Sequence, residues 1–298
     1  MKKIIITILI AVLICIGFVF IKNEFSHLLL QNANYGMPAL IKKGKVNNLF
    51  IGSSTFRQGI DVNYLGKNDY VLSYNGAQPV LEYWILNKLI NDGVKINNLY
   101  IDMYAYTLYS EPSISDTKIF METNIGEKME LFNLIDNGSF KDLWDMFVSS
   151  NNEIFFTYPI YYPTINKTFK QGGSNVKNEG ITDKKLNDLE MIKSESNINK
   201  KQKEAVEKIV KLCKKNNINL TFIEIPKPDR LCENKTYIKI MDNYKNLLEK
   251  LNAKYILADE VDNSIKNDSS NFSDLVHLSS NGKQKYTKSL IKIIKNTQ

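Results

Sequence analysis

The sequence predicts an α/β fold, in which a mostly parallel sheet lies between helices and follows an apolar amino-terminal segment. From residue 47 onward, short apolar runs alternate with segments of helical periodicity. Chains with this alternation build a parallel sheet that helices cover on both faces. The 298 residues are enough for one large domain, or two small ones, with a buried core.

The amino-terminal segment contains an uncharged apolar run, residues 4–21, which Lys22 closes. The apolar region of a secretory signal is usually about 7–15 residues long and ends at a small-residue cleavage site. This run is longer, no clear cleavage site follows it, and it is just long enough to span a membrane. We therefore expect a signal-anchor helix over 1–22. Lys2 and Lys3 favour a cytoplasmic amino terminus, with the rest of the chain extracytoplasmic.

The three cysteines predict no framework of disulfides. Cys15 lies in the apolar run, where lipidation is an alternative to a plain anchor. A lipidated cysteine normally follows a small residue, however, and here Ile14 precedes it. Cys213 and Cys232 can pair but need not.

After a juxtamembrane segment, 23–46, the elements follow in alternating order. The first strand and the helix that opens with Pro79 and ends at Gly93 have the clearest boundaries. The strands are expected at 47–53, 69–74, 97–106, 218–226 and 253–260, and the other helices at about 200–216, 235–251 and 280–296.

Residues 107–199 interrupt this order, so we expect one domain, 47–298, that carries a long insertion. The insertion holds an acidic, apolar helical piece (129–147), an aromatic stretch (155–169) and a polar region (170–200). Long insertions in α/β domains usually decorate the active face or cap it. The aromatic stretch either shapes a substrate groove or packs as a satellite core under a loop.

The formal net charge of +7 comes mostly from scattered lysines. Nucleic-acid binding needs clustered basic residues and stacking aromatics on one face, and this pattern is missing from the sequence. A basic, membrane-tethered protein suits an anionic envelope polymer or lipid surface better. The sequence has no glycine-rich nucleotide motif and no metal-ligand spacing, so we predict no cofactor and no metal.

Two serines follow the first strand directly, in Gly52-Ser53-Ser54. Ligands of open parallel sheets bind at the carboxyl ends of strands, where these serines are expected. A nucleophilic serine needs a base, usually histidine. The chain has two histidines, and His27 lies beside the membrane segment, which leaves His277.

Asp274 lies three residues before His277, just ahead of the last helix. An aspartate bonded to the imidazole would fix its tautomer and stabilise the imidazolium that forms when it takes the serine proton. Each motif alone also fits an ordinary turn. Together, at opposite ends of the alternation, they predict a catalytic triad.

These two motifs resemble those of the SGNH/GDSL hydrolase superfamily. The resemblance implies that Ser54 is the nucleophile, Asp274 the acid and His277 the base, on a flavodoxin-like three-layer sandwich. Ser53 stands where the superfamily has aspartate, which resembles the DltD-like branch. The resemblance covers the core, about 47–106 and 200–298.

The resemblance also implies an oxyanion hole, formed by the backbone N–H groups of Ser54 and Gly76. Gly76 follows the second strand in Asn75-Gly76, which is a turn dipeptide in its own right. The superfamily's third block, Gly-x-Asn-Asp, is missing here, where the sequence reads Ile101-Asp102-Met103-Tyr104. The third oxyanion donor is therefore unassigned.

Similarity to the DltD-like branch implies a membrane-anchored serine esterase or O-acyltransferase that acts on ester-linked acyl groups of envelope glycopolymers. The acyl group would be D-alanyl, the acceptor teichoic acid, and the partners an acylated polymer or carrier and a membrane O-acyltransferase. Two alternatives stay open. One is a scaffold protein that has kept the fold without efficient catalysis, and the other is a carbohydrate acetyl-esterase.

Overall fold

The computed structural model describes residues 2–30, 35–135, 138–149, 172, 178–191 and 197–296. Its centre is a five-stranded sheet in which all neighbouring strands are parallel. The spatial order is β2-β1-β3-β4-β5, the order of flavodoxin-like doubly wound folds, so the predicted fold class is confirmed. The strands are β1 (Lys45–Gly52), β2 (Tyr70–Ser73), β3 (Lys95–Asp102), β4 (Asn219–Ile223) and β5 (Lys254–Ile256).

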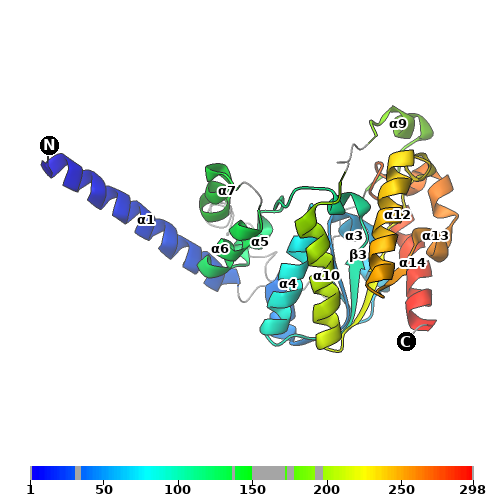
Figure 1. The fold of residues 1–298 in the computed structure, drawn as a ribbon, viewed down its shortest axis with the longest axis horizontal. Helices are drawn as coiled ribbons and strands as arrows, with labels where there is room; N and C mark the ends of the chain where they lie inside the picture. The colour runs from blue at the N-terminus through cyan, green and yellow to red at the C-terminus, as the bar shows by residue number, and fades with distance from the viewer. Residues whose placement is uncertain are drawn as a thin grey trace.

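Helices cover both faces of this sheet (Figure 1). One face packs against α4 (Pro79–Asn91), α10 (Lys200–Lys215) and α12 (Lys235–Lys250). The other packs against α3 (Ser54–Gly59) and α14 (Ser280–Asn296).

The central strands are apolar on both sides, as a doubly covered parallel sheet requires. In β1, Leu49 and Ile51 belong to the core under α4, α10 and α12. Phe50 points to the opposite face, where its ring stacks on Tyr100 of β3 with centroids 4.7 Å apart.

Three predicted strands are too long. The fourth, expected over 218–226, is observed as Asn219–Ile223. The third was expected to reach residue 106, but β3 ends at Asp102 and the chain enters a 3-10 helix, η2 (Ala105–Leu108). The fifth was expected over 253–260, but β5 stops at Ile256 and α13 (Ala258–Asp262) follows. There the Glu260 side chain accepts the N–H of Leu257 at 2.8 Å, which caps a helix where the apolar run predicted continued strand.

The helical piece expected at 129–147 is divided. The structure has α6 (Ile125–Leu134), α7 (Phe140–Trp144) and a short π-helix, η3 (Asp145–Ser149). The Ser139 hydroxyl accepts the N–H of Asp142 at 3.3 Å, and the Asp142 carboxylate accepts the N–H of Ser139 at 2.7 Å. This reciprocal cap starts a new helix at Phe140. The aromatic stretch 155–169 lies outside the described residues.

The amino-terminal helix, α1 (Lys2–Leu30), is longer than the expected anchor. Its portion Lys2–Phe25 is long and apolar enough to cross a membrane, and an 18-residue window within it has a mean hydropathy of 3.4. Most of the apolar side chains in that portion are exposed; Leu13, for example, is 66% exposed. The helix therefore has the properties of a membrane anchor or of a signal sequence.

A buried carboxyl joins the segments next to the sheet. Glu122, which follows α5 (Lys118–Met121), accepts the N–H of Met37 at 2.9 Å and the hydroxyl of Tyr74 at 2.6 Å. Met37 belongs to α2 (Gly36–Lys43), and Tyr74 follows β2. Burial raises the pKa of Glu122 to about 7, even though both hydrogen bonds favour the ionised form.

The stability of the Glu122→Gln variant relative to wild type is expected to increase as pH rises from acid to alkaline. A carboxyl whose pKa is raised on folding keeps its proton in the native state, so stability falls as pH rises from its ordinary pKa through about 7. The wild type should lose up to about 3 kcal/mol of unfolding free energy over that range, and the neutral amide should not. Chemical denaturation at a series of pH values measures this. Parallel curves for the two proteins would contradict the prediction.

Candidate active site

The turn that carries Ser54 lies at the carboxyl end of β1. The strand ends at Gly52, Ser53 is the N-cap of α3, and Ser54 is its first residue. The Ser53 hydroxyl accepts the N–H of Thr55 at 3.2 Å, as a capping serine does. A Cβ on Gly52 would lie 2.5 Å from the Cβ of Asp102, so only glycine lets the turn approach β3 so closely.

Ser54, His277 and Asp274 lie within hydrogen-bond distance of one another in series. His277 Nε2 is 2.8 Å from Ser54 Oγ, and His277 Nδ1 is 2.7 Å from Asp274 Oδ2. A carboxylate only accepts, so the bond at Nδ1 places a proton there and leaves Nε2 free to take the proton of Ser54. The chain thus brings together a hydroxyl, an imidazole and a carboxylate whose outer members are 220 residues apart.

The loop that carries His277 is closed on itself by hydrogen bonds. Asp274 Oδ1 accepts the backbone N–H groups of Val276 at 2.7 Å and His277 at 2.8 Å. The N–H of Ser273 donates to the carbonyl of His277 at 2.9 Å. Partial burial alone would raise the pKa of Asp274, but the bonds from His277 and from these N–H groups outweigh it and lower that pKa. Asp274 is therefore ionised at neutral pH, as its expected role requires.

Asp274→Asn should lower ester turnover by on the order of 10⁴-fold, because an amide can hold the imidazole in the wrong tautomer. It should also cost stability at neutral pH. A carboxyl whose pKa is lowered on folding stabilises the native state above its ordinary pKa, and this contribution is lost as pH falls through the lower, native value. Asp188→Asn, at an exposed position in α9 (Asp183–Asp188), is the matched control. Equal turnover in both variants would rule out the role of Asp274.

Asp102 holds the Ser53-Ser54 turn from the neighbouring strand. It ends β3, is 3% exposed, and its Oδ2 accepts the Ser53 hydroxyl at 2.8 Å and the Ser53 N–H at 3.3 Å. The Thr55 hydroxyl donates to the same oxygen. Burial raises the pKa of Asp102, while Lys227 and these donors oppose that rise. Asp102 therefore touches the site through Ser53 and Thr55.

Lys227 supports the histidine loop from the segment after β4. It is 3% exposed, and its Nζ donates to the carbonyl of Val276 at 2.9 Å. The ammonium also lies 5.2 Å from the centre of the Tyr104 ring. Desolvation lowers its pKa, and the negative charges of Asp102 and Glu224 raise it. Lys227 is thus a buried cation near two carboxyl groups. It is bonded to the carbonyl of Val276, the residue that precedes His277.

On the other side of Ser54, Arg57 reaches the turn after β2. Its guanidinium donates to the side-chain carbonyl of Asn75, whose N–H donates to Asp116 Oδ2 at 2.8 Å. Gly76 follows with φ of 65°, a left-handed conformation that favours glycine. Among the described residues, the backbone N–H groups of Ser54 and Gly76 donate to no other group. Both are available to an oxyanion, while the third donor stays unassigned.

The described part of the chain has no group of three His, Cys, Asp or Glu residues that could hold a metal ion. Cys213 and Cys232 are free thiols, one buried and one partly buried.

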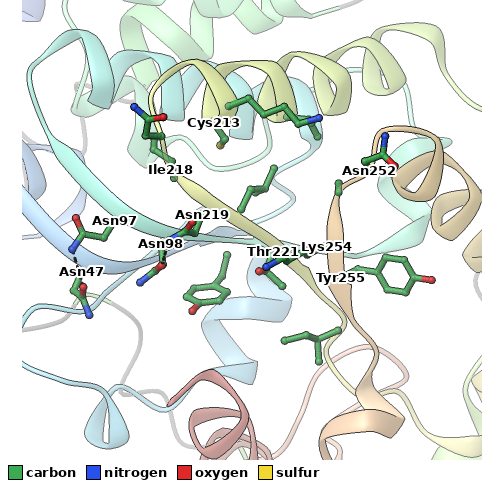
Figure 2. Close-up of a pocket in the computed structure, with 17 residues that line it drawn as sticks. Asn47, Asn97, Asn98, Cys213, Ile218, Asn219, Thr221, Asn252, Lys254 and Tyr255 are labelled. Atoms are coloured by element: carbon green, nitrogen blue, oxygen red, sulfur yellow. Dashed lines mark hydrogen bonds between the residues drawn. The ribbon is translucent and has the colours of Figure 1, made fainter. Parts of the chain in front are cut away.

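A polar cavity of about 1010 Å³ lies at the opposite end of the sheet, at the start of the strands (Figure 2). Asn47, Asn97, Asn98 and Asn219 line it, and their amides are joined across the strands, from Asn97 to Asn47 and from Asn219 to Asn98, each at 3.0 Å. Because Ser54 lies at the carboxyl ends, this cavity is not part of the triad's site.

Comparisons with known proteins assign no family. No protein-family model matches the sequence, and no curated protein matches it. Among solved structures, one described as "a putative platelet activating factor from Streptococcus pneumonia" is similar. It shares 12% identity, with a TM-score of 0.42, over 95% of this chain and 98% of that one. A likeness at this level carries no argument about function, which therefore rests on the site itself.

Sequence reasoning missed Lys227. It placed Arg57 near the mouth of the site, either in solvent or against substrate, and did not foresee its bond to Asn75. Arg57 follows Ser54 by three residues, so helical spacing could have placed it on the same face. Lys227 is one of 39 basic residues in the chain, and only the Pro-Lys-Pro context of 226–228 distinguishes it.

Proposed function

We propose that this protein is a serine acyl esterase or O-acyltransferase of SGNH type, with Ser54 as nucleophile, His277 as base and Asp274 as the acid that orients it. The observation that carries the proposal is the continuous chain of contacts at 2.8 Å and 2.7 Å from hydroxyl to imidazole to carboxylate. Its position at the carboxyl ends of the strands, where open sheets bind ligands, supports it further.

In the proposed reaction, Ser54 Oγ attacks the carbonyl carbon of an ester while His277 Nε2 takes the hydroxyl proton. The N–H groups of Ser54 and Gly76 would stabilise the tetrahedral oxyanion, at about 3 kcal/mol for each well-placed donor. His277 then gives the proton to the departing alcohol oxygen, which leaves an acyl ester on Ser54. An acceptor hydroxyl, or water, attacks that ester with His277 again as base, and the acyl group leaves on the acceptor.

The amino-terminal helix supports a location at the outer surface of a cell membrane, with the amino terminus in the cytoplasm and the α/β domain outside. On that basis, and by resemblance to the DltD-like branch, we propose acylated glycopolymers of the envelope as substrates. D-alanyl esters of teichoic acid are the specific case, with a membrane O-acyltransferase as partner. The formal net charge of +7 suits an anionic polymer of this kind.

The direct test is covalent labelling of the full chain in detergent with a fluorophosphonate, which reacts with activated serines. Labelling of one serine, lost on prior heat unfolding, supports the proposal. Adding alcohols of increasing size to the reaction with a small ester such as p-nitrophenyl acetate then separates transfer from hydrolysis. Cells with and without the protein, compared for ester-linked alanine and acetate on the envelope, decide between adding and removing acyl groups.

One observation favours a second candidate, a scaffold that keeps the fold without efficient catalysis. At the end of β3, Asp102 offers a carboxylate that accepts from Ser53 and Thr55, and we find no third oxyanion donor among the described residues. A scaffold would show neither labelling nor ester turnover, even together with its membrane partner.

A further inference from the structure

The insertion carries an exposed aromatic pair close to the amino-terminal helix. Phe140 is 78% exposed and Trp144 50% exposed, and their ring centroids lie 6.4 Å apart on α7. Four residues separate them, so they share one face of the helix. We call this pair the aromatic patch. Outside α1, the exposed large apolar side chains of the described residues are Tyr64, Met129, Phe140, Trp144 and Ile238. Three of these five lie between 129 and 144.

The patch is attached to the carboxyl-terminal part of the apolar helix. The side-chain amide of Asn23 in α1 donates to the carbonyl of Phe147 at 3.0 Å, three residues after Trp144. Buried Lys128 of α6 donates to the side-chain oxygen of Asn23. Helix α1 contacts α5, α6 and η3, and Figure 1 shows α6 and α7 next to its carboxyl-terminal half, away from the sheet.

These contacts meet α1 at the point along the helix where a membrane surface would lie. The apolar run ends at Ile21, and Lys22, Asn23 and Glu24 are the first polar residues after it. In a spanning helix, such residues mark the boundary between hydrocarbon and headgroups. The hydrogen bond from Asn23 to Phe147 holds the aromatic patch near this boundary. The patch therefore lies at the level of the membrane surface that α1 defines.

The chemistry of the patch fits that boundary. Tryptophan is enriched at membrane interfaces, because its ring is apolar and its N–H can donate to headgroups. On the same helix, the Lys141 side chain is 81% exposed and pairs with Asp145 at 2.5 Å, and its long stem leaves the ammonium within reach of a lipid phosphate.

We propose that α7 lies in the headgroup region of the membrane that α1 spans, with Phe140 and Trp144 inserted between lipids. The inference rests on α1 as a membrane anchor and is independent of the proposed catalysis. A single helix lets the attached domain swing, whereas a helix and a second lipid contact fix its tilt. The patch therefore sets how the α/β domain stands on the membrane. A partner protein or a second copy of the chain are the competing occupants.

The chain's two tryptophans make the test specific. Trp84 lies in the core and donates from its indole nitrogen to Glu130 at 3.0 Å, while Trp144 is on the patch. The full chain is purified, incorporated into protein-free lipid discs that contain anionic lipid, and compared with its Trp144→Phe variant. The difference between the two emission spectra is the signal of Trp144. Incorporation into discs by itself reports that α1 is in the membrane.

We expect the Trp144 signal in discs to lie to the blue of a water-exposed indole. Lipids brominated near the headgroup should quench more than about half of it, and more strongly than lipids brominated at the chain end, because the ring sits at the interface. Trp84→Phe, which leaves Trp144 as the single tryptophan, should show the same pattern if the variant folds, and the difference spectrum covers the case in which it does not.

A Trp144 signal at the wavelength of water, quenched by acrylamide and not by brominated lipid, would overturn the proposal. If the signal then changes only at high protein density in the disc, a second copy covers the patch. If it changes only when other membrane proteins are added, a partner protein does. Both results exclude lipid as the occupant.

Discussion

Ser54→Ala will abolish fluorophosphonate labelling and lower the turnover of a small ester by on the order of a thousandfold or more. The hydroxyl that lies 2.8 Å from His277 Nε2 is the group that we propose forms the acyl ester, and alanine has no atom to replace it. The measurement is in-gel fluorescence of the labelled chain, with the turnover of p-nitrophenyl acetate followed beside it. Thermal melting of both proteins shows that the variant is folded.

The neighbouring serine gives this experiment its control. Ser53 presents its hydroxyl to Asp102 Oδ2 at 2.8 Å and not to the imidazole, so Ser53→Ala should still be labelled. It should lose about 1 kcal/mol of stability, because it removes the N-cap of α3. Labelling that survives in Ser54→Ala and disappears in Ser53→Ala would reverse the assignment. Labelling of neither variant nor of the wild type favours the scaffold.

The fold was predictable because its evidence is local. Apolar runs such as 47–53 and the helix signals at Pro79 and Gly93 lie within a few residues of the elements that they define. The predicted element boundaries were wrong where a side chain caps a helix inside an apolar run. Glu260 caps α13 inside a predicted strand, and Ser139 starts a new helix inside a predicted one. Gly138-Ser139 is a stop followed by a cap, so closer reading of that dipeptide would have found the break.

The site was predictable in part for a different reason. One histidine lies far from the membrane segment, and strand ends meet at one edge, so Ser54 and His277 had few alternatives. What supports them was not predictable. Asp102 and Lys227 act through burial, and burial depends on which elements pack together. No spacing in the sequence distinguishes a lysine under the site from the many that face solvent.

Lys227→Met is expected to lower the free energy of unfolding by about 3–5 kcal/mol, because it leaves buried carboxylates without their cation. Because methionine fills nearly the same space, the variant keeps most of the packing and loses the charge and one hydrogen bond. Asp102 is buried and Glu224 is partly buried, and Lys227 lowers the pKa of each against the effect of desolvation. The carbonyl of Val276 also loses its donor. Urea denaturation of the full chain in detergent micelles measures the change.

The pH dependence separates charge from packing. Without Lys227, the pKa values of Asp102 and Glu224 rise further above that of an unfolded carboxyl. The native state then holds protons that the unfolded state releases, so stability falls as pH increases. The deficit of Lys227→Met should therefore be small near pH 4, at the ordinary carboxyl pKa, and should grow towards neutral pH. A deficit that is constant with pH would mean that Lys227 acts through packing alone.

The double variant Asp102→Asn/Lys227→Met should recover part of the unfolding free energy that Lys227→Met loses. It removes, together with the cation, one of the carboxylates that would otherwise be left without it. An interaction energy of about 1–3 kcal/mol between the two positions is expected for groups in one buried network. Asp102 holds the turn of Ser54, and Lys227 holds the carbonyl next to His277. Coupling between them would mean that the attraction between these two buried charges positions both halves of the site, so that turnover should fall in either single variant even where each remains folded. Additive effects would leave the Ser53-Ser54 turn and the histidine loop as independently supported parts.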